Sequence, residues 1–376
     1  MNAPLAGLLV VSLEHAVAAP FCTARLADAG ARVIKIERPE GDLARRYDEA
    51  TIGGSSYFVW CNRGKESVVL DLREEVSREQ LRKLIARADI LVQNLKPGAL
   101  LRLGVLPDQQ ARDEQGLICC SITGYGDSGP LAARKAYDLL IQAESGLASV
   151  TGSSEPARVG ISIVDIATGA TAYGAILEAL IRRSRTGEGA DLRISMFDVM
   201  AEWLTVPLLN SEAGRPAQRV GLAHPSIAPY GLFSTADNRQ ILMGLQNERE
   251  WQAFCIKVLA SPEVLEDARF SSNVARVANR KATDDLVART FSQLTREEAI
   301  ARLSAADIAY AEINDMTALS RHPHLRRITV PTAGGPVSFP SPPVIEADKP
   351  RRYGKVPALG EHTQRVLAEI EPTSPG

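Results

Sequence analysis

An aspartate interrupts an apolar stretch at a position that suits covalent chemistry. Asp165 lies in VGISIVDIATG, next to residues 166–185, whose apolar spacing predicts a long helix. One interpretation is structural, because aspartate is a favoured N-cap and a first-turn acid complements the helix dipole. The other is functional, because a carboxylate kept ionised by a helix start and poorly hydrated by apolar neighbours suits a nucleophile. Spacing alone leaves both open.

Basic residues follow several predicted strands. Arg38 stands at the end of the second strand, where doubly wound folds place the ribose of a bound adenosine nucleotide. An arginine there suits a phosphorylated ribose, either NADP or the 3′-phosphate of CoA, although a plain surface arginine fits the position too. Further cations follow strands or lie in adjoining loops, and the hypothesis is that several of them converge on a polyanion: Arg45, Arg46, Lys96, Arg102 and Lys135.

Several sites of known chemistry are missing from the sequence. The first strand-to-helix turn, EHAVAAP, has no glycine, which argues strongly against a pyrophosphate-binding turn and a nicotinamide cofactor. The five histidines show no metal-binding spacing, and neither a P-loop nor a Gly-x-Ser-x-Gly elbow occurs. We therefore expect no metal.

The composition is that of a globular enzyme. The 376 residues are 45% hydrophobic and 23% charged, and the formal net charge is -2, which argues weakly against a nucleic-acid partner. Five cysteines without C-x-x-C spacing indicate reduced thiols and a cytoplasmic protein. We read neither a signal peptide nor a membrane span from the N-terminal residues.

Strand-like and helix-like stretches alternate over the first 125 residues, which predicts an α/β fold with a mostly parallel, Rossmann-like sheet. Strands are expected at 7–15, 31–39, 67–72, 88–95 and 116–126, and helices at 20–30 and 77–88. The character changes near residue 205, where short strands and two helices near 248–259 and 283–304 predict a smaller α+β domain. We assign 1–204 and 326–376 to the large domain and 205–325 to the small one.

Seven stretches, in this order, resemble the family III CoA-transferases, the group that contains formyl-CoA transferase and carnitine CoA-transferase. They are LADAGARVIKIERPEGD, NRGKESVVLDL, NLKPG, SITGYGDSGP, KAYDLLIQAESG, GISIVDIATG and PALGEHT. The resemblance covers nearly the whole chain. It implies an interlocked homodimer in which each chain forms a ring through which its partner passes.

The resemblance also assigns roles to residues. It makes Asp165 the covalent nucleophile and places Arg38 at the adenosine-phosphate end of CoA. It implies that CoA is a substrate, with no permanently bound cofactor, and that Gly244, Leu245 and Gln246 form a lid. Val17 or Ala18 stands where the family has an active-site glutamine. The implied CoA contacts are Leu70, Asn94, Leu95, Arg102, Lys135, Tyr137 and Met196.

The implied reaction passes CoA from an acyl-CoA to a small carboxylic acid through aspartyl anhydride and aspartyl-CoA thioester intermediates. The segments HPSIAPYG and SSYFVWCNRGKESVVLDL resemble members that act on short dicarboxylates such as itaconate, mesaconate or citramalate. A second carboxylate needs a cationic or hydrogen-bonding anchor, for which His224 and Arg46 are the candidates.

Three alternatives stay open. An acyl-CoA racemase shares the fold but needs a histidine in a G-H-D-type segment, where this chain has Ala136-Tyr137-Asp138. An NADP oxidoreductase would use Arg38 but lacks its glycine turn. A non-catalytic CoA-binding scaffold would keep the groove without needing Asp165.

Overall fold

The computed structural model describes residues 3–347 and 351–371, which form two compact units. Unit 1 comprises 1–148, 158–206 and 326–376, and unit 2 comprises 149–157 and 207–325. The short segment 149–157 thus belongs with residues far along the chain, which its composition does not reveal.

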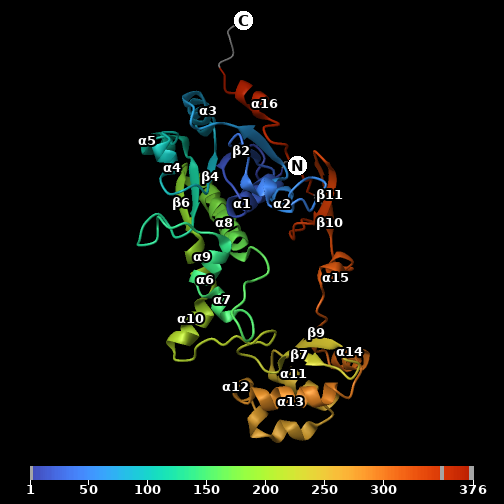
Figure 1. Cartoon of the computed structure of the whole chain (residues 1–376). Coiled ribbons are helices and arrows are strands. Elements are labelled where there is room, and N and C mark those ends of the chain that lie inside the picture. Colours follow the sequence, from blue (N-terminus) through green and yellow to red (C-terminus); the bar gives the residue numbers. More distant parts are fainter. Residues whose placement is uncertain (1–2, 348–350, 372–376) are drawn as a thin grey trace. The chain divides into compact units, whose positions relative to one another are not determined.

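A six-stranded parallel sheet forms the centre of unit 1 (Figure 1). The strands are β1 (Leu9–Leu13), β2 (Arg32–Glu37), β3 (Lys65–Val69), β4 (Ile90–Gln93), β5 (Ile118–Thr123) and β6 (Ala190–Ser195). Their order is β3-β2-β1-β4-β5-β6, and every neighbouring pair is parallel. The predicted α/β fold with a parallel sheet is confirmed. Because the strand order reverses between β1 and β4, a crevice opens at their carboxyl ends.

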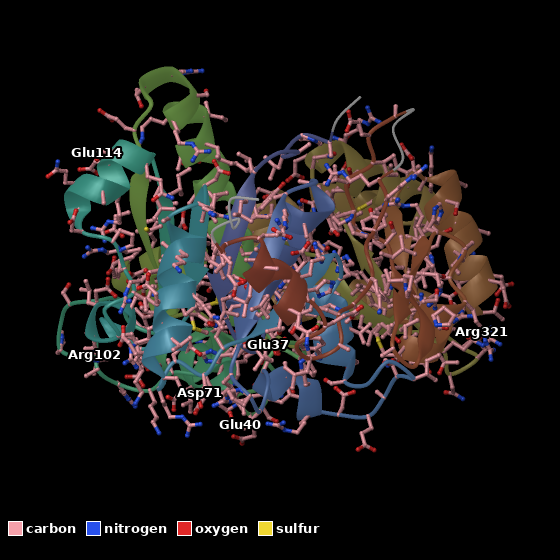
Figure 2. The ribbon with its side chains drawn as sticks, turned by 90° about the horizontal axis from the view of Figure 1, so that it is seen from above. Glu37, Glu40, Asp71, Arg102, Glu114 and Arg321 are labelled. Atoms are coloured by element: carbon pink, nitrogen blue, oxygen red, sulfur yellow. The ribbon has the colours of Figure 1, made fainter. Side chains whose placement is uncertain are left out.

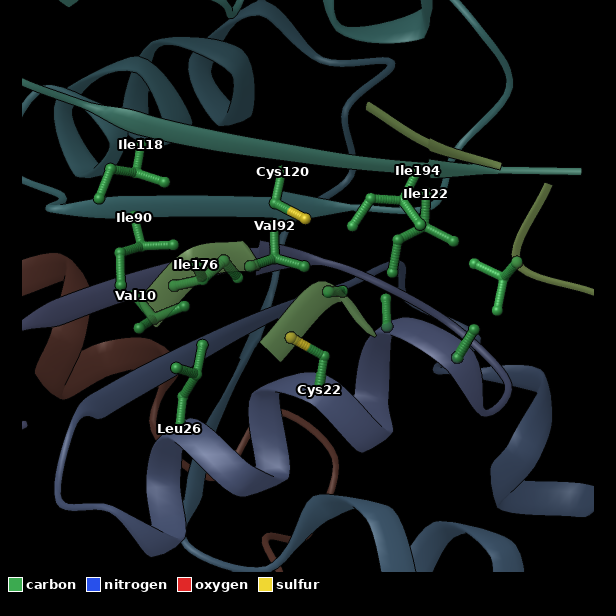
Figure 3. Close-up of a cluster of buried hydrophobic side chains, with 14 of the residues drawn as sticks. Val10, Cys22, Leu26, Ile90, Val92, Ile118, Cys120, Ile122, Ile176 and Ile194 are labelled. Atoms are coloured by element: carbon green, nitrogen blue, oxygen red, sulfur yellow. The ribbon is translucent and has the colours of Figure 1, made fainter. Parts of the chain in front are cut away.

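Helices cover both faces of this sheet. On one face lie α1 (Ala18–Asp28), α8 (Ile163–Thr186) and α9 (Met196–Trp203). Figure 3 shows Cys22 and Leu26 of α1 and Ile176 of α8 against the strand residues Val10 and Val92. The other face is covered by α3 (Glu75–Ile85), α4 (Ala99–Arg102) and α16 (Thr363–Ala368). The apolar strands are thus buried on both sides, as parallel sheets require.

The remaining elements of unit 1 lie between and after the strands. They are η1 (Leu43–Arg46), α2 (Ser56–Asn62), α5 (Gln109–Gln115), α6 (Asp138–Glu144) and the hairpin β10 (Arg327–Thr332) and β11 (Gly335–Pro340). The short helix α7 (Leu147–Val150) starts in unit 1 and continues into unit 2. The helix α10 (Thr205–Glu212) starts in unit 1 and continues into unit 2.

Unit 2 contains an antiparallel three-stranded sheet of β7 (Tyr230–Ser234), β8 (Gln240–Gly244) and β9 (Ala309–Ala311). Its helices are α11 (Glu248–Ala253), α12 (Asn273–Ala278), α13 (Arg280–Phe291), α14 (Arg296–Ala305) and α15 (Met316–Ser320), with the shorter turns η2 (Phe254–Val258), η3 (Pro262–Glu266) and η4 (Ala268–Phe270). The single helix predicted near 283–304 is wrong. Thr295 begins a new helix there, because its side chain and that of Glu298 form a capping box.

Among the described residues, α8 alone is long and apolar enough to cross a bilayer by length and composition. The sequence interpretation noted no such segment. The buried side chains of α8, among them Val164, Ala172 and Ile176, pack into the core beside α1. Packing in unit 1 therefore accounts for part of the apolarity of this helix, since 39% of its most apolar window is buried.

Candidate active site

Two adjoining cavities lie at the carboxyl ends of the strands of unit 1. The first, of about 690 Å³, is lined by the residues that end β1, β2 and β3, and we call it the Arg38 cavity. The second, of about 610 Å³, is lined by the segments that follow β1, β4 and β5 and by the start of α8, and we call it the Asp165 cavity. His15, Leu43 and Leu95 line both, so the two cavities share a wall at the switch point of the sheet.

Acidic and basic side chains mix around the Arg38 cavity. Glu37, Glu40 and Asp71, which Figure 2 labels close together, line it along with Arg38 and the predicted apolar contact Leu70. Glu37 is paired with Arg45, and Asp71 with Arg73. Arg38 donates from Nε to the carbonyl oxygen of Gly41 at 3.1 Å, and no carboxylate within the described ranges pairs with it. Its charge is therefore available to an anionic ligand.

Asp165 lies in the first turn of α8 and lines the second cavity, where it is partly buried. It is not the N-cap of the helix, so that part of the structural interpretation is wrong, but it is the first-turn acid that the same interpretation expected. The cap position belongs to Ser162, whose side chain makes no capping bond. The first-turn amides of Val164 and Asp165 instead donate to Asp138 Oδ1, at 2.8 and 3.1 Å.

Burial and the neighbouring Asp138 carboxylate raise the pKa of Asp165 to about 7. The helix start was expected to keep this carboxylate ionised, and with this pKa it is ionised mainly above neutral pH. The causes are the poor hydration of the site and the second negative charge that it carries. A carboxylate of raised basicity is a stronger nucleophile once it is ionised.

The turn between β1 and α1 borders both cavities and is fixed from two sides. The side-chain amide of Asn94 accepts from the His15 amide at 3.0 Å and donates to the His15 carbonyl at 2.9 Å. Ala16 adopts the left-handed conformation, with φ 62°, and its amide donates to Asp42 Oδ1 at 3.1 Å. The turn thus takes a glycine-like conformation without a glycine, and hydrogen bonds stabilise it.

The structure brings most of the predicted CoA contacts to one of the two cavities. Asn94, Leu95, Lys135, Tyr137 and Met196 line the Asp165 cavity, and so do Lys96, Val17 and Ala18. The side chain of Tyr137 is 67% exposed, so it forms part of the rim rather than the floor.

Three predicted cations lie elsewhere. Arg102 lines neither cavity and donates to the Pro97 carbonyl at 3.0 Å. Arg46 also lies outside both linings and donates to the Glu40 carbonyl at 2.7 Å. Arg45 is held by Glu37. The hypothesis that several of these cations converge is met by two of the five, since Lys96 and Lys135 line a common cavity and Arg45, Arg46 and Arg102 do not.

The other predicted substrate contacts belong to unit 2. His224 stacks on Tyr230 with 5.5 Å between ring centroids, and its Nδ1 accepts from the Ser226 amide at 3.1 Å. Burial and the Arg280 guanidinium lower the pKa of His224, which favours a neutral imidazole.

Gly244 is the last residue of β8, and a Cβ there would lie 2.8 Å from the Tyr230 ring. Close packing against this ring therefore explains the glycine. Gln246 follows in an exposed turn, where its backbone amide donates to Glu250 Oε2 at 2.7 Å.

Several residues of the Asp165 cavity escaped the sequence interpretation, among them Tyr47, Tyr57, Arg134 and Arg158, and Asp138 was considered only in the comparison with a racemase. Burial raises the pKa of Tyr47, and the carboxylates of Asp42 and Asp165 add to the effect. The only available signal was the local one at Asp138, an acid after a loop and before an apolar helix. Within the described ranges, no group of three histidine, cysteine or acidic residues is placed to hold a metal ion.

Comparison with known proteins identifies the family. The model of CoA-transferase family III matches residues 5–363. Succinyl-CoA:glutarate CoA-transferase of Mus musculus is 33% identical over 98% of this chain and 86% of its own length. Succinyl-CoA:mesaconate CoA-transferase of Haloarcula marismortui is 31% identical over 96% of this chain and 95% of its own length.

A solved structure agrees with these relatives. The crystal structure of a CAIB/BAIF family protein from Brucella suis has a TM-score of 0.82 and 35% identity, covering 99% of this chain and all of that one. Fold, sequence relatives and family model point the same way, and the chain belongs to CoA-transferase family III.

Proposed function

We propose that this enzyme transfers CoA from succinyl-CoA to a short dicarboxylate, with Asp165 as the covalent nucleophile. The observation that carries the proposal is the state of Asp165. It is a partly buried carboxylate without an ion pair in the described part of the chain, in a cavity that adjoins the one holding Arg38. Relatives named for succinyl-CoA with glutarate or mesaconate support the choice of donor and acceptor class.

The proposed chemistry needs only carboxylates and a thiol. Asp165 attacks the thioester carbonyl, the C–S bond breaks, and CoA leaves as the thiolate with a mixed anhydride formed on Asp165. The thiolate attacks the Asp165 carbonyl and displaces succinate, which gives an aspartyl-CoA thioester. The acceptor carboxylate attacks this thioester and again frees the thiolate, which finally attacks the acceptor's acyl carbon and releases Asp165.

The two cavities give this reaction a place for each end of CoA. We propose that the Arg38 cavity holds the adenosine 3′-phosphate, with Leu70 against the base. The pantetheine arm then passes the shared wall at His15 and Leu95 to reach Asp165. Lys135, Tyr137, Asn94 and Met196 flank that path. Arg102 is proposed as a CoA contact on the resemblance alone.

In an acceptor with two carboxylates, one reacts at Asp165 and the other needs a cation nearby to bind it. Arg158 and Lys96 line the Asp165 cavity, and Arg134 does so too but is paired with Glu144. Arg158 donates from Nε to the Val159 carbonyl at 3.1 Å and precedes Asp165 on the same segment. We propose Arg158 as the anchor in place of Arg46, which lies outside this lining. We keep the proposal that His224, Gly244 and Gln246, all in unit 2, contact the substrate.

The family resemblance supports a cytoplasmic, interlocked homodimer. Large apolar side chains of the α9–α10 region are exposed in the single chain, including Trp203 at 56% and Val206 at 67%. Such surfaces usually mark protein contacts.

Trapping of the covalent intermediate tests the function directly. The enzyme is incubated with succinyl-CoA and hydroxylamine, digested and analysed by mass spectrometry. A hydroxamate on Asp165 is expected, because hydroxylamine intercepts the anhydride or the thioester at that carbonyl. A hydroxamate on another residue, or none, would contradict the assignment. A panel of mono- and dicarboxylates with succinyl-CoA then tests the acceptor class, and activity with monocarboxylates alone would refute the dicarboxylate proposal.

A further inference from the structure

Asp138 joins the starts of two helices beside the nucleophile. It is the first residue of α6, and its Oδ1 accepts the amides of Val164 and Asp165 in the first turn of α8. The other first-turn amides of α8 are satisfied by backbone, with Ile163 donating to Ile161 and Ile166 to Ser162. Asp138 thus performs the capping that Ser162, at the cap position itself, does not.

A buried glutamine fixes the orientation of Asp138. Gln142 is fully buried, and its Oε1 accepts from the Val159 amide at 2.9 Å. Its Nε2 must therefore point the other way, where it donates to Asp138 Oδ2 at 2.7 Å. Both oxygens of Asp138 are occupied as acceptors, which suits an ionised carboxylate.

The consequence for Asp165 is freedom from local bonds. A carboxylate at the third position of a helix commonly bonds back to the helix start. Here Asp138 takes those amides, and no hydrogen bond or ion pair joins the Asp165 carboxylate to any residue in 3–347 or 351–371. Asp165 is left to face the cavity with its oxygens uncommitted.

We propose that Asp138 is the positioning residue of the nucleophile: it holds Asp165 toward the thioester and keeps a negative charge beside it. This inference rests on the proposed role of Asp165. The two carboxylates repel each other before the reaction. When Asp165 attacks the thioester its charge passes to the departing thiolate, and the repulsion at the helix start is relieved. The arrangement therefore favours acylation over the resting state.

Other charges around the cavity do not offset this repulsion. Tyr47 follows η1, and burial, Asp42 and the Asp165 carboxylate raise its pKa. Burial and Asp138 raise the pKa of Asp165. The remaining titratable or charged groups of the lining are His15, Tyr57, Lys96, Arg134, Lys135, Tyr137 and Arg158. None of these pairs with Asp165, so Asp138 is the neighbour whose charge the test should remove.

The test is the pH dependence of kcat/KM for succinyl-CoA with glutarate as the probe acceptor. Asp138→Asn keeps an acceptor for the two amides but removes the charge. The acid limb of the profile is expected to move to lower pH by about one unit, with kcat near pH 8 reduced by about tenfold. The dissociation constant for CoA should change by less than about threefold, since Arg38 and the shared wall are untouched.

A matched control separates charge from capping. Asp108 caps α5 through the Ala111 amide at 2.8 Å and lines neither cavity, so Asp108→Asn should leave the profile unchanged. If Asp138→Asn does not fold, the neutral Asp138→Ser replaces it with the same expectation. An unmoved acid limb in a folded, CoA-binding variant overturns the inference. If wild-type Asp165 forms no hydroxamate, the proposed function fails instead, so the two failures are distinguishable.

Discussion

Two groups of carboxylates, one buried and one partly buried, border the same crevice of unit 1, and they differ in whether cations compensate their charge. Below the β1–α1 turn, Glu14 and Asp42 meet Lys35 and Lys65, and all four are at most 5% exposed. Lys35 Nζ lies 2.8 Å from Asp42, and Lys65 Nζ lies 2.7 Å from Glu14. At the start of α8, Asp138 and Asp165 lie together with no cation paired to either in the described residues.

The pKa values follow this difference. Burial opposes ionisation of Glu14 and Asp42, yet the lysines outweigh it and lower both pKa values. At Asp165 burial and Asp138 act together and raise the pKa. The compensated cluster stabilises the turn that carries His15 and Ala16, while the uncompensated pair includes the proposed nucleophile Asp165. Compensated carboxylates thus serve the scaffold in one place, and uncompensated ones serve the proposed chemistry in the other.

The largest expected effect is on the reaction. Asp165→Asn should lower kcat by on the order of 10⁴-fold or more, because the nucleophilic oxygen is lost while the CoA cavities stay intact. Steady-state assays with succinyl-CoA and glutarate measure it, and Asp165→Ala excludes activity regained by deamidation. Turnover near the wild-type rate in both variants would show that the uncompensated pair does not carry the chemistry.

The compensated cluster should respond in stability. Lys35→Met leaves two buried carboxylates with only Lys65, and the free energy of unfolding should fall by about 3–5 kcal/mol. Chemical denaturation measures this loss.

The double variant Lys35→Met with Asp42→Asn provides the matched control, because the asparagine can still accept from the Ala16 amide. It should recover much of the stability that Lys35→Met loses. A loss equally large in both variants would mean that packing, rather than charge compensation, explains the cluster.

Local patterns in the sequence predicted the scaffold better than this charge arrangement. Apolar runs gave the parallel strands, and Asp165 stood out because it broke one such run. Lys35, however, lies inside the strand β2 and was read only as part of a strand. Its partners Glu14 and Asp42 stand 21 and 7 residues away, and no local period links them.

The prediction of Asp165 as the helix cap was wrong because the interacting residues are far apart in the sequence. Asp138 precedes Asp165 by 27 residues, so the bonds from one to the other exist only after both helices are placed. The residue type of Asp165 favoured an N-cap, but the helix starts earlier, at Ile163, and the distant Asp138 side chain accepts its first-turn amides. The sequence therefore located the candidate nucleophile but inverted the electrostatics of its site.

A third prediction concerns the stability cost of the uncompensated pair. The folded pKa of Asp165 lies near 7, above its unfolded value of 3.8, so the native state binds the extra proton between these values. Wild-type stability must then fall as pH rises through this window. Asp165→Asn should be more stable than wild type by about 3 kcal/mol at pH 8, and the gain should shrink steadily toward pH 4. Thermal unfolding across this range measures it; a gain independent of pH would contradict the assigned titration.

The smallest effect on stability is expected at Glu37, a buried carboxylate whose paired cation is only partly buried. Glu37 is buried, and Arg45, which is partly exposed, donates to both of its oxygens at 2.7 and 2.8 Å. Although burial opposes it, Arg45 and Lys35 lower the pKa of Glu37, so this pair stabilises the fold above pH 4.5 and its contribution fades as pH falls through the folded pKa. Arg45→Met keeps an apolar stem over Phe58 and should cost about 1–2 kcal/mol at pH 7, less than Lys35→Met, because Ser67 and the Asp42 amide still donate to Glu37. Denaturation at pH 7 and pH 4 should show the loss shrinking at the lower pH. If Arg45→Met loses as much free energy of unfolding at pH 7 as Lys35→Met, the exposure of the paired cation does not determine how much stability is lost when that cation is removed.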